Sequence, residues 1–120
     1  MSHVFLIGNF TLHSGSRSCF KVDCDALTME DWSALAYLVA ARIRFNTVEG
    51  VPRGGLAFAD ALRKYATNKE ADGLLIADDV LTTGASMENQ RRERKAQGVV
   101  AFARGQCPRW VSAIWQSRME

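Results

Sequence analysis

From residue 30 onward, the chain alternates between segments with the apolar spacing of a helix and short apolar runs typical of buried strands. Apolar residues recur at offsets of three and four over 32–43, and helical spacing returns over 56–65. Continuous apolar runs follow at 73–77 and 99–103. Such alternation is typical of a parallel sheet covered by helices. We therefore expect an α/β fold in which a small parallel sheet carries helices on both faces.

The segment before this alternation has a different pattern. Residues 4–22 alternate apolar and polar positions around a turn at 13–16, which favours an N-terminal extended segment of strands or a hairpin. Thr28 and Asp31 then resemble a capping box that opens the first helix. The apolar face of this helix is expected to be Trp32, Leu35, Ala36, Val39 and Ile43. The remaining predicted elements are strands over 47–51 and 110–115 and a polar, arginine-rich helix over 85–97.

Length and charge limit the classes of function. The chain has 120 residues, and its 15 lysines and arginines nearly balance 13 aspartates and glutamates, giving a net charge of +2. This length fits a single domain over residues 1–120. A balance so close to neutral argues against a nucleic-acid partner gripped through its phosphates, and the charged run at 91–95 is interpreted as an exposed helix face. Any anion must therefore be held by local design.

The apolar runs and the cysteines indicate the compartment and the redox state of the protein. No run approaches the ~20 apolar residues that cross a bilayer, and the first residues lack the features of a signal peptide. We expect a cytoplasmic protein with no membrane partner. Three cysteines, Cys19, Cys24 and Cys107, cannot all pair internally and match no zinc or redox spacing, so they are interpreted as reduced structural thiols.

Residues 74–86 carry the chemistry. An apolar strand delivers Asp78 and Asp79, whose side chains point to opposite faces if the strand continues through them. Hydroxyls and backbone N–H groups at the start of the next helix would form a phosphate cradle, made of Thr82, Thr83, Gly84, Ala85 and Ser86. Carboxylates beside a phosphate site suit the diol of a ribose 5-phosphate. The alternative is a polar strand end followed by an ordinary capped helix.

Three motifs in order resemble one known family. Residues 74–86 resemble the phosphoribosyl pyrophosphate (PRPP) binding motif of the type I phosphoribosyltransferases: an apolar strand, two acidic residues and a Thr-Thr-Gly loop. Residues 10–23 look like the N-terminal segment of orotate phosphoribosyltransferases, and residues 49–55 are similar to the family's pyrophosphate loop. The resemblance implies a Rossmann-like core, Mg²⁺-dependent transfer of a phosphoribosyl group from PRPP to a nucleobase with release of pyrophosphate, and a homodimer.

The resemblance also implies roles for individual residues. Asp78 and Asp79 would hold the ribose hydroxyls, and Mg²⁺ indirectly through substrate or water. The cradle at 82–86 would hold the 5′-phosphate. The pyrophosphate would meet Val51, Pro52, Arg53 and Gly54. The base or another part of the substrate would contact His13, Phe20, Lys21 and Arg104.

The chain also departs from the family pattern. Relatives carry a long basic lid loop and a further strand where only eight residues, 66–73, separate Tyr65 from Leu74 here. We therefore expect no lid and a smaller sheet. Since a lid excludes water and completes the charge around pyrophosphate, its loss should cost catalysis more than affinity. A second subunit could replace its charges, as could the basic residues Arg17, Lys21, Arg53, Arg104 and Arg109. His13 stands where relatives usually have lysine.

Two functions from different classes remain open at this point. One is a minimal phosphoribosyltransferase, which the intact acidic pair favours. The other is a non-catalytic module that binds PRPP, a ribose phosphate or a nucleotide, which the short connection favours. A generic parallel α/β domain without a phosphate site would require all three motif matches to be accidental. The sequence does not identify the base.

Overall fold

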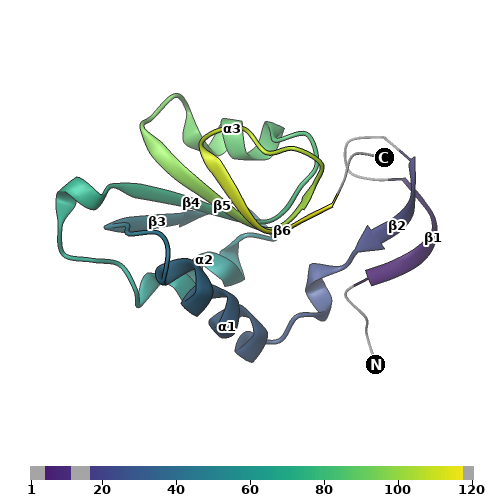
Figure 1. The fold of residues 1–120 in the computed structure, drawn as a ribbon, viewed down its shortest axis with the longest axis horizontal. Coiled ribbons are helices and arrows are strands. Elements are labelled where there is room, and N and C mark those ends of the chain that lie inside the picture. Colours follow the sequence, from purple (N-terminus) through teal and green to yellow (C-terminus); the bar gives the residue numbers. More distant parts are fainter. Residues whose placement is uncertain (1–4, 12–16, 118–120) are drawn as a thin grey trace.

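The computed structural model describes residues 5–11 and 17–117, with side chains described from residue 22 onward (Figure 1). Its first two strands, β1 (Phe5–Thr11) and β2 (Arg17–Val22), pair antiparallel. This pair confirms the extended N-terminal segment expected from the alternating pattern. In Figure 1 it lies to one side of the main sheet, and a short 3-10 helix at Cys24–Ala26 leads from it toward the first α-helix.

Within the described residues, the main sheet has four parallel strands in the order β3-β4-β5-β6. Their bounds are Thr47–Gly50 for β3, Leu74–Leu81 for β4, Ala96–Arg104 for β5 and Val111–Ser117 for β6. Because all four strands run in one direction, their carboxyl ends meet at the same edge of the sheet. Ligands bind at this edge in open α/β folds.

Helices cover both faces of this sheet, which confirms the expected fold class. On one face α1 (Met29–Ala40) and α2 (Leu56–Arg63) pack together, with the rings of Trp32 and Phe58 5.1 Å apart. Leu75, Ala77 and Val99 complete that core from the sheet. On the other face Met87 of α3 (Ala85–Arg91) packs in a second cluster that includes Ile76 and Val100.

The first helix begins as its sequence predicts. Asp31 N donates to Thr28 Oγ1 at 3.1 Å, and Thr28 N donates to Asp31 Oδ2 at 2.8 Å, which closes the capping box. The predicted apolar face is buried as far as Val39. Ile43 is an exception, because α1 ends at Ala40 and Ile43 follows in the connection to β3, where it is partly buried against the same core.

Several predicted boundaries are wrong. The strand expected over 73–77 continues to Leu81, because β5 runs beside it and keeps pairing through Ala103. The helix expected over 85–97 ends at Arg91, since Arg92 and Glu93 take the left-handed conformation, with φ of 52° and 62°. The charged run at 91–95 thus forms a helix end and a turn rather than an exposed helix face. Strand β5 begins at Ala96, three residues before the predicted start, and takes in two residues that the sequence assigned to the helix. Strands β3 and β6 and helix α2 differ from their predicted bounds by one or two residues.

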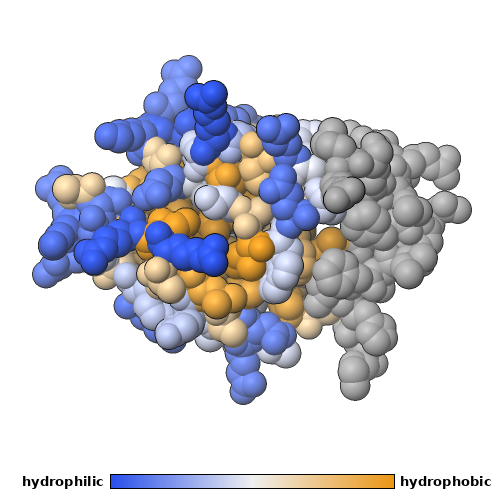
Figure 2. All heavy atoms as spheres, in the orientation of Figure 1, coloured by the Kyte–Doolittle hydropathy of each residue, from blue (hydrophilic) through white to orange (hydrophobic). Residues whose placement is uncertain are grey.

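The surface of the described residues is mixed. Figure 2 shows apolar side chains gathered in the middle of one face, with charged side chains around and across them. Among the described residues, no helix has the length and apolar character needed to span a membrane.

Candidate functional site

Asp78 and Asp79 lie inside β4, near its carboxyl end. Each carboxylate accepts a hydrogen bond from the backbone of the following residue: Asp78 Oδ1 from Asp79 N at 2.8 Å, and Asp79 Oδ1 from Val80 N at 2.7 Å. Successive strand positions face opposite sides, yet the two carboxyl groups remain close enough to interact. The strand end therefore presents the two acidic groups together.

Asp78 is a buried carboxyl group, 6% exposed. Burial raises its pKa, and the adjacent Asp79 carboxyl raises it further, while the hydrogen bond from the Asp79 backbone acts in the opposite direction. A ligand that brings hydroxyl donors or positive charge would relieve this repulsion. The electrostatics of the pair thus favour a diol or a hydrated cation over an anion at this point.

Residues 51–55 turn over the end of β4. Val51 N donates to Ala77 O at 2.9 Å, and Gly55 N donates to Val51 O at 2.8 Å. Gly54 faces Asp79 so closely that a Cβ atom there would lie 2.7 Å from Asp79 Cγ. Only glycine permits this approach. The structure therefore brings the predicted pyrophosphate loop into contact with the acidic pair.

A cavity of about 610 Å³ opens beside this contact, within the size range of small-molecule sites. Three predicted site residues, Arg53, Gly54 and Asp79, form part of its wall. The rest of the wall is Val22, Asp23, Cys24, Asp25, Leu27, Met29, Trp32 and Ala57. Asp23 and Asp25 were not predicted as site residues. The available signal was the motif at 10–23, which ends at Asp23.

The predicted phosphate cradle follows β4 as a loop that leads into α3. Gly84 at its centre has φ of 87°, a left-handed conformation that favours glycine. Thr83 Oγ1 accepts a hydrogen bond from Ala85 N at 3.3 Å. Thr83, Ala85 and Ser86 are exposed, whereas Thr82 is partly buried. The loop thus leaves polar groups accessible at the carboxyl edge of the sheet.

The residues predicted to contact the base are less fully described. Arg104 is the last residue of β5, at the same edge of the sheet as the acidic pair, and is partly buried. Phe20 and Lys21 lie in β2, but their side chains are not described. His13 falls outside the described residues. Contacts between these four residues and a base remain predictions.

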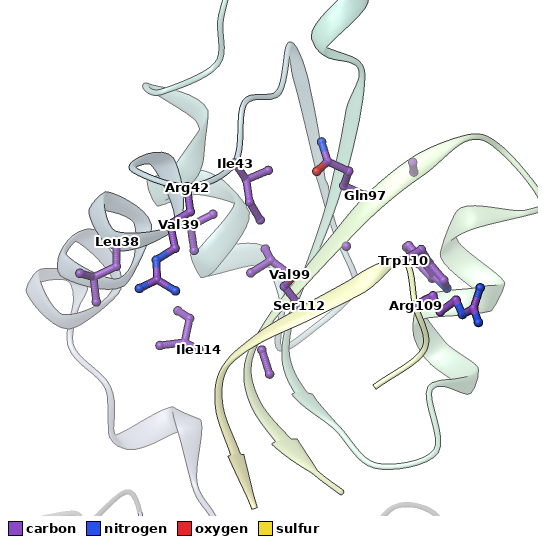
Figure 3. A pocket seen from close by; sticks show the side chains of 13 residues that line it. Leu38, Val39, Arg42, Ile43, Gln97, Val99, Arg109, Trp110, Ser112 and Ile114 are labelled. Atoms are coloured by element: carbon purple, nitrogen blue, oxygen red, sulfur yellow. The ribbon is translucent and has the colours of Figure 1, made fainter. Parts of the chain in front are cut away.

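A second cavity, of about 570 Å³, lies away from these motifs (Figure 3). Leu38, Arg42 and Ile43 line it from α1 and the turn after it, and the first residues of β5 and β6 line it from the sheet. It contains none of the predicted site residues. Arg109, which the sequence offers as a substitute for lid charges, lines this cavity and is not part of the wall beside Asp79.

Comparison with known proteins decides the family. No protein-family model matches the chain. The curated orotate phosphoribosyltransferase of Pyrobaculum aerophilum is 32% identical over 133 positions, covering 83% of this chain and 69% of the relative. That of Pyrobaculum calidifontis is 33% identical over 128 positions, covering 83% and 67%. The chain belongs to the orotate phosphoribosyltransferase family.

Solved structures share the family fold. Orotate phosphoribosyltransferase from Aeropyrum pernix superposes with a TM-score of 0.71 at 20% identity, covering 94% of this chain and 88% of the other. The UMP synthase of Leishmania donovani gives the same score at 21% identity, and this chain spans 34% of its length. At these identities the likenesses confirm the fold.

This family member is shorter than its relatives inside the matched region. Both alignments are longer than the 120-residue chain, so the relatives carry residues there that it lacks. Its connection from α2 to β4, residues 64–73, contains only a 3-10 turn at Glu70–Asp72. Thr67 N donates to Phe45 O at 2.8 Å, and Thr67 Oγ1 donates to Asp72 Oδ2 at 2.6 Å. As the sequence predicts, this connection is a short, hydrogen-bonded link rather than a lid.

Proposed function

We propose that this orotate phosphoribosyltransferase family member transfers a phosphoribosyl group from PRPP to a nucleobase and releases pyrophosphate. The observation that supports this most directly is the contact between Gly54 of the pyrophosphate loop and Asp79 of the acidic pair. PRPP carries its pyrophosphate on the carbon next to the ribose diol. A pyrophosphate loop that touches the carboxylates proposed for the ribose diol matches this arrangement of groups in PRPP.

Each part of PRPP has residues of suitable chemistry. Ribose hydroxyls would donate hydrogen bonds to Asp78 and Asp79. The 5′-phosphate would accept hydrogen bonds from the cradle of Thr82, Thr83, Gly84, Ala85 and Ser86. The pyrophosphate would contact Val51, Pro52, Arg53 and Gly54, where the exposed Arg53 supplies a positive charge. The base would contact His13, Phe20, Lys21 and Arg104.

The reaction exchanges one bond at the anomeric carbon for another. The bond from that carbon to the pyrophosphate oxygen breaks, and its electron pair leaves with pyrophosphate. A base nitrogen forms the new bond with its electron pair, and the proton of that nitrogen is released to solvent. Positive charge grows on the ribose as this happens, and the carboxylate of Asp79 would stabilise it. Asp78, whose pKa burial raises, would add its charge once the bound ligand favours the ionised form. Loss of one well-placed electrostatic contact of this kind costs about 3–4 kcal/mol of barrier.

Mg²⁺ would be held at this site together with ligands from the substrate and from water. Among the described residues, no three histidine, cysteine, aspartate or glutamate side chains are grouped to hold a metal ion. Mg²⁺ usually keeps several waters and binds one or two carboxylates together with substrate phosphates. Asp78 and Asp79 would hold it through such waters or through PRPP. The ion would neutralise charge on the departing pyrophosphate.

A homodimer is part of the proposal, because a second subunit could supply basic groups that a lid supplies in relatives. Sedimentation at micromolar concentration would measure its mass directly. A mass equal to one chain would contradict this part of the proposal and leave the ligand assignment unchanged.

The second candidate is a module that binds PRPP, a ribose phosphate or a nucleotide without turning it over. The short connection at 64–73 favours this candidate, because it offers nothing to close over the ligand. Such a protein would keep affinity for Mg-PRPP and release no pyrophosphate.

Two measurements separate these candidates. Calorimetry with Mg-PRPP should show binding that Asp78→Asn and Thr83→Ala weaken; no binding at millimolar ligand by the parent would remove the site assignment. Pyrophosphate release is then measured across a panel of nucleobases. Release with one base supports the transferase, and binding without release on any base supports the module.

A further inference from the structure

Helix α3, which follows directly from the proposed phosphate cradle, is fixed by side chains on two flanks. On the β6 side, Trp110 Nε1 donates to Glu88 Oε1 at 2.8 Å, and the Arg91 guanidinium lies 4.3 Å from the centre of the Trp110 ring. On the β3 side, Glu49 reaches the far end of the helix. The motifs at 49–55 and 74–86 gave no indication of a link between β3 and α3.

The link on the β3 side is a bidentate ion pair between Glu49 and Arg94. Arg94 Nη1 donates to Glu49 Oε2 at 2.7 Å, and Arg94 Nη2 donates to Glu49 Oε1 at 2.9 Å. Gln90 Nε2, on α3, donates to the same Glu49 Oε1 at 2.9 Å. These donors hold the pKa of Glu49 down at about 2, with the Arg94 hydrogen bonds as the main cause. The carboxylate is therefore charged and accepts hydrogen bonds at any physiological pH.

Arg94 also closes the end of the helix. Its Nε donates to Arg91 O at 2.8 Å, and its Nη2 donates to Gln90 O at 2.6 Å. These carbonyls belong to the last turn of α3, where helical hydrogen bonding ends, and Arg91 O also accepts from Arg94 N at 3.1 Å. One guanidinium thus binds both the end of α3 and a strand on the edge of the sheet, 45 residues away in sequence.

Glu49 and Arg94 are each close in sequence to a segment of the candidate site. Glu49 is two residues before Val51, the first residue of the pyrophosphate loop. Arg94 is attached through α3 to the phosphate cradle at 82–86. The pair therefore joins the two segments that would hold the opposite ends of PRPP. Its side chains are 40% and 36% exposed, so its expected effect is on the spacing of these segments rather than on the overall stability of the protein.

We infer that Glu49 and Arg94 are positioning residues for PRPP, which fix the phosphate cradle relative to the pyrophosphate loop. This inference rests on the proposed function. PRPP gains affinity by engaging both segments at once, and that gain depends on how rigidly their spacing is held. A ligand that engages only one segment gains nothing from the pair. Ribose 5-phosphate and pyrophosphate are such ligands.

The test compares three ligands by calorimetry in the presence of Mg²⁺: PRPP, ribose 5-phosphate and pyrophosphate. Arg94→Ala removes the pair, Arg94→Lys keeps the charge without the two-pronged geometry, and Glu49→Gln keeps the shape without the charge. Arg63→Ala is the matched control, because it removes an exposed ion pair with Asp60 on α2. Urea unfolding of each variant shows whether it folds. If Arg94→Ala does not fold, Glu49→Gln takes its place in the comparison.

We expect Arg94→Ala and Glu49→Gln to weaken PRPP binding about tenfold, while either fragment changes less than about twofold. Arg94→Lys should recover part of the loss, and Arg63→Ala should change none of the three. Equal losses for PRPP and its fragments, or no loss at all, would overturn the positioning role while the proposed function stands. If the parent protein binds no PRPP, the positioning role and the proposed function are both wrong.

Discussion

The carboxylate of Asp79 lies against the bare Cα of Gly54, where a methyl group would overlap it. This contact joins the loop after β3 to the carboxyl-terminal part of the neighbouring parallel strand β4. Since the loop and the strand end belong to separate motifs, the contact makes one candidate site of them. It also means that the geometry of the acidic pair depends on a residue in the loop after β3.

Gly54→Ala should disturb this site without removing any polar group. The new Cβ would sit 2.7 Å from Asp79 Cγ and 2.8 Å from Asp79 Oδ1, so the carboxylate or the loop must move. Overpacking of this kind costs about 1–3 kcal/mol of unfolding free energy. Urea unfolding measures that loss, and calorimetry should show weaker Mg-PRPP binding.

The same substitution in an Asp79→Ala background provides the control. Without the carboxylate, the added methyl group has room, so Gly54→Ala should cost much less stability there. Equal costs in the two backgrounds would place the strain elsewhere in the loop and contradict the contact.

Asp78→Asn should make the protein more stable in alkaline solution while it impairs function. The folded protein holds the proton of Asp78 to a higher pH than the unfolded chain does, because the pKa is raised by burial and by Asp79. Between the two pKa values the native state binds more protons, so stability falls as pH rises from about 4 toward 8. Asparagine removes that loss and still accepts from Asp79 N. We expect a gain of about 1–2 kcal/mol at pH 8.

Urea unfolding at pH 5 and pH 8 tests this expectation. Asp60→Asn serves as the control, because the Asp60 side chain is 72% exposed on α2. An Asp78→Asn protein whose stability changes with pH as the parent's does would refute the account of the buried pair.

Local patterns predicted most of the fold and selected the segments that form the candidate site. The capping box at Thr28 depends on residues three apart, and the acidic pair and the cradle lie within 74–86, so a short window contains them. The parallel sheet followed from the alternation of periods. In each case the deciding interactions are close in sequence.

What the sequence did not predict depends on distant contacts. The end of α3 at Arg91 is set by left-handed residues and by the link from Arg94 to Glu49. The helical pattern through residue 97 does not indicate this end. The closeness of Gly54 and Asp79 likewise arises only when β3 and β4 pair. Such contacts require the register of the sheet, which periodicity does not supply.

Cys24 should be almost unreactive in the folded protein. Burial, and then the carboxylate of Asp79, raise the pKa of its thiol to about 12, and the residue is only 7% exposed. Because the thiolate is the reactive form, alkylation at pH 8 should be at least about 100-fold slower than in urea. Peptide mapping by mass spectrometry measures the rate at each cysteine.

Cys107 supplies an internal comparison. Burial raises the pKa of its thiol as well, but its side chain is only partly buried. It should therefore react faster than Cys24 in the folded protein. Labelling of Cys24 at the rate seen in urea would show that this wall of the 610 Å³ cavity opens in solution.

Gly98→Ala should weaken the packing of α3 against β5. A Cβ at this position of β5 would lie 2.8 Å from Met87 Cε and 2.9 Å from Trp110 Cζ3, so the helix and the β5–β6 connection pack on bare backbone here. We expect a loss of about 1–3 kcal/mol in unfolding free energy. In a Met87→Ala background the loss should shrink, since the Met87 contact is gone. A loss of unfolding free energy that shrinks in this background places the strain on α3, and the affinity of Gly98→Ala for ribose 5-phosphate should then fall as well. A loss that does not shrink would show that Trp110 rather than α3 absorbs the strain, and the affinity for ribose 5-phosphate should then be unchanged.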